Sequence, residues 1–208
     1  MIKVYGMRPA LNELKGITRD IRVTWTLEEV GLSYEHILLD PQKGENKTPE
    51  YLKLNPTGKV PTLTDGEFTI FESSAICSYL AHKKEKLLPK FNSPAYWLHQ
   101  QWIAYVLTNI EPHTARVFGC DYFFEQNENT IFARKLATDI LGRMLMPLED
   151  KLKLNPYLMG EEFLLCDLFL ATSLMYVRHT DVLQNFPYLK RYVKECENRP
   201  AHRKASKN

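Results

Sequence analysis

The segment at residues 55–74, which reads NPTGKVPTLTDGEFTIFESS, constrains the fold more than any other part of this chain. Asp65-Gly66 lies between two runs rich in β-branched and aromatic residues, and this dipeptide is a typical signal of a two-residue β-hairpin turn. After the hairpin the apolar spacing becomes helical, so we expect Ser73 or Ser74 to cap the start of a helix. The segment therefore predicts a β-hairpin that leads directly into a helix.

The same segment offers groups that fit a small zwitterionic peptide. Pro61 opens the first strand of the hairpin, and Val60-Pro61 is a candidate cis peptide bond. A cis bond would turn the N–H and C=O of Val60 outward, toward the peptide group of a ligand. The N–H groups at the helix start favour a carboxylate, while Glu72 can hold an ammonium group. The alternative is that Glu72 and the serines after it only cap the helix.

The linked strings NPTGKVPTL and FESSAI resemble the glutathione-binding signature of the cytosolic glutathione S-transferases, and the similarity extends over nearly the whole chain. The serine-type members, of theta, phi and bacterial kinds, are the most similar. The resemblance implies an α/β plus all-α fold, with a thioredoxin-like N-terminal domain of βαβαββα order and an all-helical C-terminal domain. It implies glutathione as co-substrate, bound in part by Val60, Pro61, Glu72 and Ser73.

The hydrophobic periodicity agrees with this order of elements. In the first domain we expect strands at residues 2–5 and 34–39, helices at 19–30 and from 49, the hairpin, and a helix that ends near 82. A strand, a helix and a strand within about 40 residues predict a parallel pair. In the second domain we expect helices that start at 93 and lie at about 128–152, 163–178 and 186–196. The expected domains are 1–82 and 93–208, joined by a polar linker at 83–92.

The segment from Gly160 to Thr172 resembles the helix-capping motif of the same family. Asp167 is present, but Leu164 stands where a Ser or Thr normally precedes the Asp by three positions. This departure removes an N-cap contact that usually contributes about 1 kcal/mol, so we expect packing to stabilise this helix start instead.

Composition argues against several other classes of protein. The chain has 27 basic and 25 acidic residues, a net charge of +2, and no basic run before its tail, so nucleic-acid binding is not indicated. It shows no signal-peptide pattern and no apolar stretch long enough to span a membrane, and we expect a soluble, cytoplasmic protein. The cysteines lack the spacing of a metal site or a disulfide framework, so we expect reduced thiols and no metal: Cys77, Cys120, Cys166 and Cys196.

The chemistry depends on the group that meets the glutathione thiol. A free thiol with a pKa of about 8.5 is only about 3% ionised at pH 7, and a hydrogen-bond donor at the sulfur increases that fraction. The resemblance places Thr18, counted back from Arg22, at the position of the catalytic serine. The alternative is that Thr18 only caps the first helix. Tyr5 is a rival donor by residue type, although we expect it in the core.

Three further residues match positions that bind the glycine end of glutathione in the family. These are Asn46, Lys47 and Lys59. Asn46 carries no charge, so binding of the carboxylate would rest on charge-assisted hydrogen bonds from the two lysines. Either lysine alone would be interpreted as an ordinary surface charge.

A polar set in the helical domain recurs at helical spacing and could line the electrophile pocket: Tyr105, Asn109, His113 and Arg116. An equally good interpretation is a mixed polar face or a dimer surface. The long connection at residues 7–17, which contains Arg8, is a candidate lid over the same pocket. The resemblance also implies a homodimer.

Our interpretation is a glutathione transferase with a role in detoxification, in which Thr18 donates to the sulfur for attack on a small electrophile. Two alternatives remain open, namely a non-catalytic glutathione-binding protein and an interaction scaffold that keeps only the fold. A thiol-disulfide oxidoreductase is disfavoured because no cysteine lies near the start of the first helix. The sequence does not identify the electrophile, nor does it separate conjugation from peroxide reduction or isomerisation.

Overall fold

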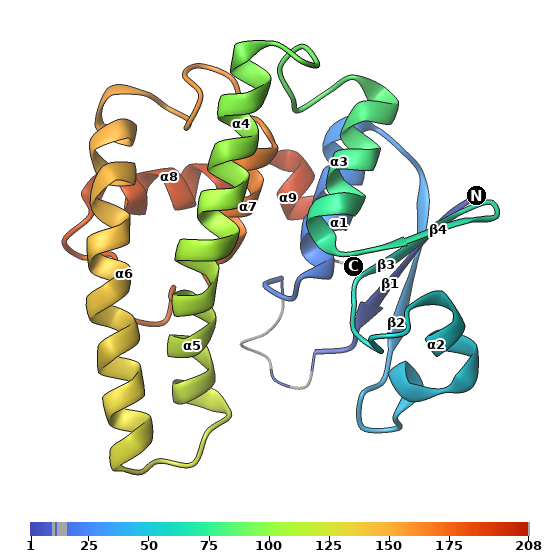
Figure 1. Cartoon of the computed structure of the whole chain (residues 1–208), viewed down its shortest axis with the longest axis horizontal. Helices are drawn as coiled ribbons and strands as arrows, with labels where there is room; N and C mark the ends of the chain where they lie inside the picture. The colour runs from blue at the N-terminus through green and yellow to red at the C-terminus, as the bar shows by residue number, and fades with distance from the viewer. Residues whose placement is uncertain (10, 12–15, 208) are drawn as a thin grey trace. The chain divides into compact units, whose positions relative to one another are not determined.

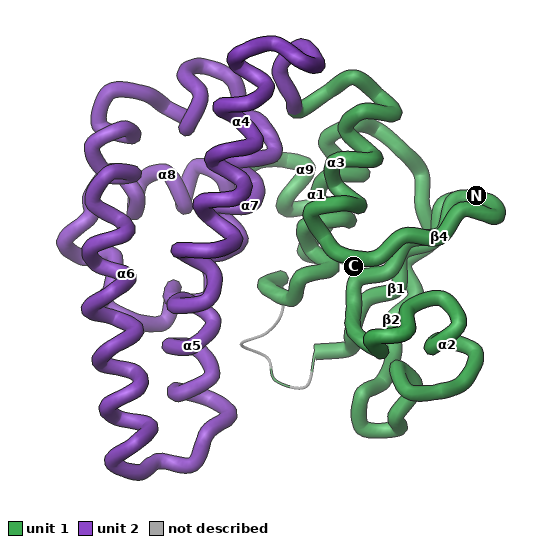
Figure 2. Tube along the Cα trace, viewed as in Figure 1, with its two compact units in different colours: residues 1–87, 199–208 green, residues 88–198 purple. Residues whose placement is uncertain are grey.

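The computed structural model describes residues 1–9, 11 and 16–207, which form two compact units (Figure 2). Unit 1 contains residues 1–87 and 199–208, and unit 2 contains residues 88–198. The segment 199–208, expected in the helical domain, thus groups with the first unit. The domain limits given by the sequence stay a prediction.

A mixed four-stranded sheet lies at the centre of unit 1, with the strand order β2-β1-β3-β4. Its strands are β1 (Ile2–Met7), β2 (Tyr34–Leu39), β3 (Thr62–Asp65) and β4 (Phe68–Phe71). β1 pairs in parallel with β2 and antiparallel with β3, and β3 pairs antiparallel with β4. The predicted thioredoxin-like order βαβαββα is confirmed.

Helices cover both faces of this sheet (Figure 1). α1 (Asp20–Val30) and α3 (Ser73–Lys84) pack on one face, and α2 (Pro49–Leu54) lies on the other, after a short 3-10 helix at Glu45–Lys47. Alternate residues of β1 serve the two faces. Val4 is fully buried beneath α1 and α3, whereas the ring of Tyr5 lies 5.7 Å from that of Tyr51 in α2. Tyr5 is half-buried, so it lies at the edge of the interior and not in the buried core that we expected.

The hairpin turn lies one residue later than predicted. Asp65 pairs with Phe68, so Gly66 and Glu67 form the turn, and of these only Gly66 has a positive φ, at 64°. One positive φ at the first central position is the pattern of a type II′ turn. Asp65 stays in the strand because Tyr79 of α3 donates a hydrogen bond of 2.9 Å to its carboxylate. The predicted Asp65-Gly66 turn is therefore wrong by one residue.

Unit 2 is built from helices. They are α4 (Pro94–Tyr105), a π-helical turn (Val106–Ile110), α5 (Glu111–Tyr122), α6 (Glu128–Leu154), α7 (Leu165–Met175) and α8 (Pro187–Glu197). The hydroxyl of Ser93 caps α4 by accepting a hydrogen bond from the Tyr96 N–H at 3.2 Å. Pro112 lies at the second position of α5, where the π-helical turn already interrupts the regular bonding. α6 continues through Pro147.

Asp167 is the polar centre of unit 2. Its carboxylate accepts hydrogen bonds from the N–H of Leu158 at 2.8 Å, the N–H of Leu164 at 3.0 Å and the hydroxyl of Tyr192 at 3.0 Å. Burial raises the pKa of this carboxyl to about 6, and the hydrogen bonds act against that rise. Leu164 is the N-cap residue of α7 and makes no side-chain cap. Asp167 therefore supplies the polar contact at this helix start, where we expected packing alone.

A short helix that the sequence analysis did not predict, α9 (Pro200–Ala205), packs on α1 in unit 1. The ring of His202 lies 4.6 Å from that of the fully buried Trp25. The guanidinium of Arg199 forms two hydrogen bonds with Glu29, at 2.6 and 2.9 Å. These contacts join residues far apart in the sequence and complete the packing around α1.

None of the helices among the described residues is both long and apolar enough to cross a membrane. The cysteines are buried and free. Within the same residues, no group of His, Cys, Asp and Glu side chains is arranged to hold a metal ion.

Candidate functional site

The segment before β3 is fixed in position from α2. The hydroxyl of Tyr51 donates to the carbonyl of Lys59 at 2.6 Å, and the amide of Asn55 donates to the same carbonyl at 2.8 Å. The Val60-Pro61 bond is cis. In the part of the chain that the structure describes, no hydrogen bond uses the backbone N–H or C=O of Val60. Both groups are therefore available to a ligand.

Tyr51 and Asn55 are supporting residues that the sequence analysis missed. Each also contacts the hydroxyl of Thr62, at 2.8 and 3.1 Å, so both ends of the bend are held. Burial raises the pKa of Tyr51, although its side-chain hydrogen bonds oppose this. Asn55 is the first residue of the signature segment, so its place in the motif could have indicated a role at the site. The sequence spacing of Tyr51 gives no indication of its hydrogen bond with Lys59.

Glu72 begins α3 in an unusual backbone conformation. It is the N-cap residue and has φ 71°, which is uncommon for a residue with a side chain and is often found where function demands it. The prediction that Ser73 or Ser74 is the N-cap is therefore wrong, because the chain turns one residue earlier. Ser73 is buried in the first turn, and its hydroxyl accepts a hydrogen bond from Arg22 at 3.5 Å.

The hairpin register brings the predicted ligand groups to one end of the sheet. Thr62 pairs with Phe71, so Pro61 and Glu72 flank the same end of the β3–β4 pair. The side chain of Glu72 is exposed, and it has no hydrogen-bond or ion-pair partner among the described residues. A free carboxylate thus stands beside an unpaired backbone segment, as the interpretation of a peptide-binding site requires.

Asn46 and Lys47 lie beside the same bend. The amide of Asn46 donates to the carbonyl of Gly58 at 2.8 Å. Gly58 has φ 62°, and a Cβ built on it would lie 2.7 Å from the Lys47 ammonium. Asn46 therefore positions the loop, and the ammonium of Lys47 lies close to its backbone. The side chain of Lys59 is exposed.

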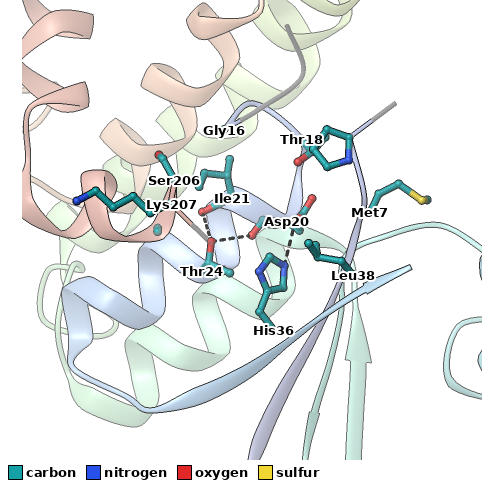
Figure 3. Close-up of a pocket in the computed structure, with 12 residues that line it drawn as sticks. Met7, Gly16, Thr18, Asp20, Ile21, Thr24, His36, Leu38, Ser206 and Lys207 are labelled. Atoms are coloured by element: carbon teal, nitrogen blue, oxygen red, sulfur yellow. Dashed lines mark hydrogen bonds and ion pairs between the residues drawn. The ribbon is translucent and has the colours of Figure 1, made fainter. Parts of the chain in front are cut away.

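Thr18 lies just before α1 and is half-buried. Its carbonyl accepts a hydrogen bond from the N–H of Ile21 at 3.0 Å, but the N-cap position of α1 belongs to Arg19. Thr18 lines a cavity of about 270 Å³ together with Asp20 and His36 (Figure 3). None of the other residues predicted for the glutathione site lines this cavity.

The four residues predicted for the electrophile are all in unit 2, and Tyr105, Asn109 and Arg116 have partners there. The Tyr105 hydroxyl donates to the carbonyl of Met144 at 2.8 Å, and the Asn109 amide donates to the carbonyl of Tyr105 at 3.3 Å. The Arg116 guanidinium lies 5.7 Å from the centre of the Phe124 ring. Burial lowers the pKa of His113. Their role toward an electrophile stays a prediction.

The predicted lid at residues 7–17 falls partly outside the described residues. Arg8, which is described, forms an ion pair of 3.4 Å with Asp40 at the end of β2.

Comparisons with known proteins agree for both units. The family profile described as the N-terminal domain of glutathione S-transferase matches residues 2–82, and the profile of the C-terminal domain matches residues 121–200. Glutathione S-transferase hmp2 of Hypomyces subiculosus is 32% identical over 196 residues, covering 89% of this chain and 92% of the relative. Glutathione S-transferase F10 of Arabidopsis thaliana is 34% identical over 155 residues, 71% of each protein.

A solved structure shows the same fold over almost the full length. It is the glutathione transferase URE2P6 from Phanerochaete chrysosporium in complex with oxidized glutathione, with 28% identity and a TM-score of 0.85, covering 99% of this chain and 94% of that one.

Proposed function

Since the chain belongs to the glutathione S-transferase family, we propose that it binds glutathione as co-substrate and activates its thiol for attack on a small electrophile. One observation carries this proposal. The carboxylate of Glu72 and the backbone N–H and C=O of Val60 lie at the same end of the hairpin, and none of these groups has a partner among the described residues. In this arrangement Glu72 holds the ammonium of the γ-glutamyl group, and the N-terminal amides of α3 at Ser73 bind its carboxylate. Val60 then pairs with the peptide group of the cysteine, and Lys47 and Lys59 attract the glycine carboxylate.

The localisation, the oligomeric state, the biological role and the electrophile-binding residues are proposals that rest on membership of the family. We propose a cytoplasmic homodimer that acts in detoxification. Tyr105, Asn109, His113 and Arg116 are our candidates for binding the electrophile.

Replacing Glu72 with glutamine tests the binding site directly. Gln keeps the size of the side chain but removes the charge that attracts the ammonium, so we expect glutathione affinity to fall about tenfold or more. Isothermal titration calorimetry measures the affinity for glutathione. Glu67→Gln is the matched control, because Glu67 is an exposed glutamate at the hairpin turn. Equal affinity in both variants would exclude Glu72 from the site.

Thr18→Val tests the role of the hydroxyl, because valine keeps the shape of threonine and lacks only the donor. We expect the pKa of the enzyme-bound thiol to rise by about one to two units, since the thiolate loses one hydrogen bond. Titration of the thiolate absorbance of bound glutathione measures this value, and Thr18→Ser should keep it low. If the pKa stays the same in Thr18→Val, another group stabilises the thiolate, and Tyr5→Phe becomes the next variant to measure.

One observation favours a second candidate, a glutathione-binding protein without turnover. Thr18 lines a cavity to which neither Val60 nor Glu72 contributes. Tight binding of glutathione with no conjugation of aryl halides, epoxides or isothiocyanates would identify this alternative.

A further inference from the structure

A buried arginine of α1 contacts the first turn of α3. Arg22 is 1% exposed, and its Nη1 donates a hydrogen bond of 3.5 Å to the hydroxyl oxygen of Ser73. The backbone of Arg22 also meets α3, because its carbonyl accepts a hydrogen bond from the thiol of Cys77 at 3.4 Å. A guanidinium keeps its proton in proteins, so a full positive charge lies next to this helix start.

The same helix start holds hydrogen-bond donors without acceptors. Glu72 is the N-cap of α3 and makes no side-chain cap, and in the described part of the chain no hydrogen bond uses the N–H groups of residues 73–75. The N–H of Ile76, in contrast, donates to the carbonyl of Glu72 at 3.0 Å. The positive end of the helix dipole and the charge of Arg22 therefore act at the same place, and both favour an anion.

The contact with Arg22 also determines how the Ser73 hydroxyl can act. A guanidinium has donors and no acceptor, so the Ser73 oxygen accepts from Arg22 and keeps its own proton for another partner. Ser73 is 6% exposed, and its hydroxyl donates to no acceptor among the residues that the structure describes. A buried donor in this state gains a hydrogen bond when an acceptor binds. The hydroxyl is therefore set to donate to an anion at the start of α3.

We propose that Arg22 is a positioning residue for the α-carboxylate of the γ-glutamyl group of glutathione. Arg22 holds the Ser73 oxygen, which leaves the hydroxyl proton to that carboxylate, and its charge adds to the attraction of the free amides. The bond of 3.5 Å is long, and a carboxylate that accepts from the hydroxyl polarises the pair and strengthens it. This inference rests on the proposed function and deepens it, because it adds a residue of α1 that acts through Ser73.

Two ligands that differ only in this carboxylate test the proposal. They are glutathione and γ-aminobutyryl-cysteinylglycine, in which a hydrogen replaces the α-carboxylate while the ammonium for Glu72 is kept. Calorimetry on the full chain gives both affinities, and their ratio is the readout. We expect Arg22→Met, which removes the charge and the donors, to lower glutathione affinity about tenfold or more and to change affinity for the analogue less than about twofold. An arginine that only joins α1 to α3 would affect both ligands equally.

Three further variants complete the design. Arg22→Lys keeps the charge but loses the fixed geometry of the guanidinium, so the ratio should fall by about threefold, between the parent and Arg22→Met. Ser73→Ala should also lower the ratio, and Arg22→Met should change it less in that background than in the parent. Arg143→Met, at an exposed position of α6, is the matched control and should leave the ratio unchanged.

An unchanged ratio in Arg22→Met would overturn the inference and leave Arg22 as a structural contact. If that variant does not fold, an unchanged ratio in both Arg22→Lys and Ser73→Ala has the same meaning. A parent protein that binds the two ligands equally would also overturn the inference, because the carboxylate is then not bound at α3, while Glu72 keeps its proposed role. A parent protein that binds neither ligand would refute the proposed function, and this inference with it.

Discussion

Replacing Asp167 with alanine is expected to lower the free energy of unfolding by about 3–5 kcal/mol. The change leaves the N–H groups of Leu158 and Leu164 buried without their acceptor, whereas the hydroxyl of Tyr192 keeps the backbone carbonyl of residue 167 at 3.0 Å. It also removes the only polar side chain that the described residues place at the start of α7 as a cap. Urea denaturation, read from the midpoint at constant slope, measures the loss.

Two further variants serve as controls for the measurement on Asp167→Ala. Asp150→Ala, at an exposed position of α6, should change stability by less than about 0.5 kcal/mol. Asp167→Asn should fall between the parent and Asp167→Ala, because it keeps one acceptor and removes the charge whose burial raises the pKa of this carboxyl. A loss below about 1 kcal/mol in Asp167→Ala would show that solvent or other side chains replace the missing acceptor.

Gly6→Ala is expected to destabilise the protein by about 3 kcal/mol or more. The added Cβ would lie 2.4 Å from the Asp20 carboxylate and 2.5 Å from the His36 ring, so both side chains must move. Each is held between α1 and the sheet, which leaves little room for adjustment. Thermal and urea denaturation of the variant measure the effect.

Gly142→Ala is the matched control for this substitution. Gly142 lies within α6, and a Cβ built there meets no atom within 4 Å. Alanine at a helical position should raise stability by about 0.5–1 kcal/mol. The two glycines should therefore respond with opposite signs, and a stable Gly6→Ala variant would show that the Asp20–His36 pair can separate without cost.

The elements that carry local signals could be predicted from the sequence. Thr48 and Ser93 accept hydrogen bonds from the third residue after them, as helix caps do, and Gly31 ends α1 with φ 76°. Each of these signals depends on a few neighbouring residues. The strands and most helices therefore lie close to their expected positions.

The errors arise where a distant partner decides the conformation. Asp65 was predicted in the turn, but its hydrogen bond from Tyr79 holds it in β3. The serines after Glu72 were predicted as caps, yet Ser73 lies within α3 and meets Arg22 of α1. Neither contact can be inferred from periodicity, because each joins separate elements.

The candidate site shows the same division. A linked sequence motif predicted the ligand-binding residues Val60, Pro61 and Glu72. The structure places Pro61 and Glu72 at the same end of the hairpin. The roles of Tyr51 and Asn55, which hold the carbonyl of Lys59, depend on how α2 packs beside the bend. That geometry exists only after the chain has folded.

The contacts of α9 with α1 affect the order in which the protein can fold during synthesis. The ribosome makes α1 long before α9, and all of unit 2 is translated in between. Until residues 199–205 have emerged, Trp25 lacks the His202 ring and Glu29 lacks the Arg199 guanidinium. Unit 1 therefore cannot follow the usual order of folding, in which an N-terminal domain folds completely before the rest of the chain is made. Its last packing step follows translation of the helical unit.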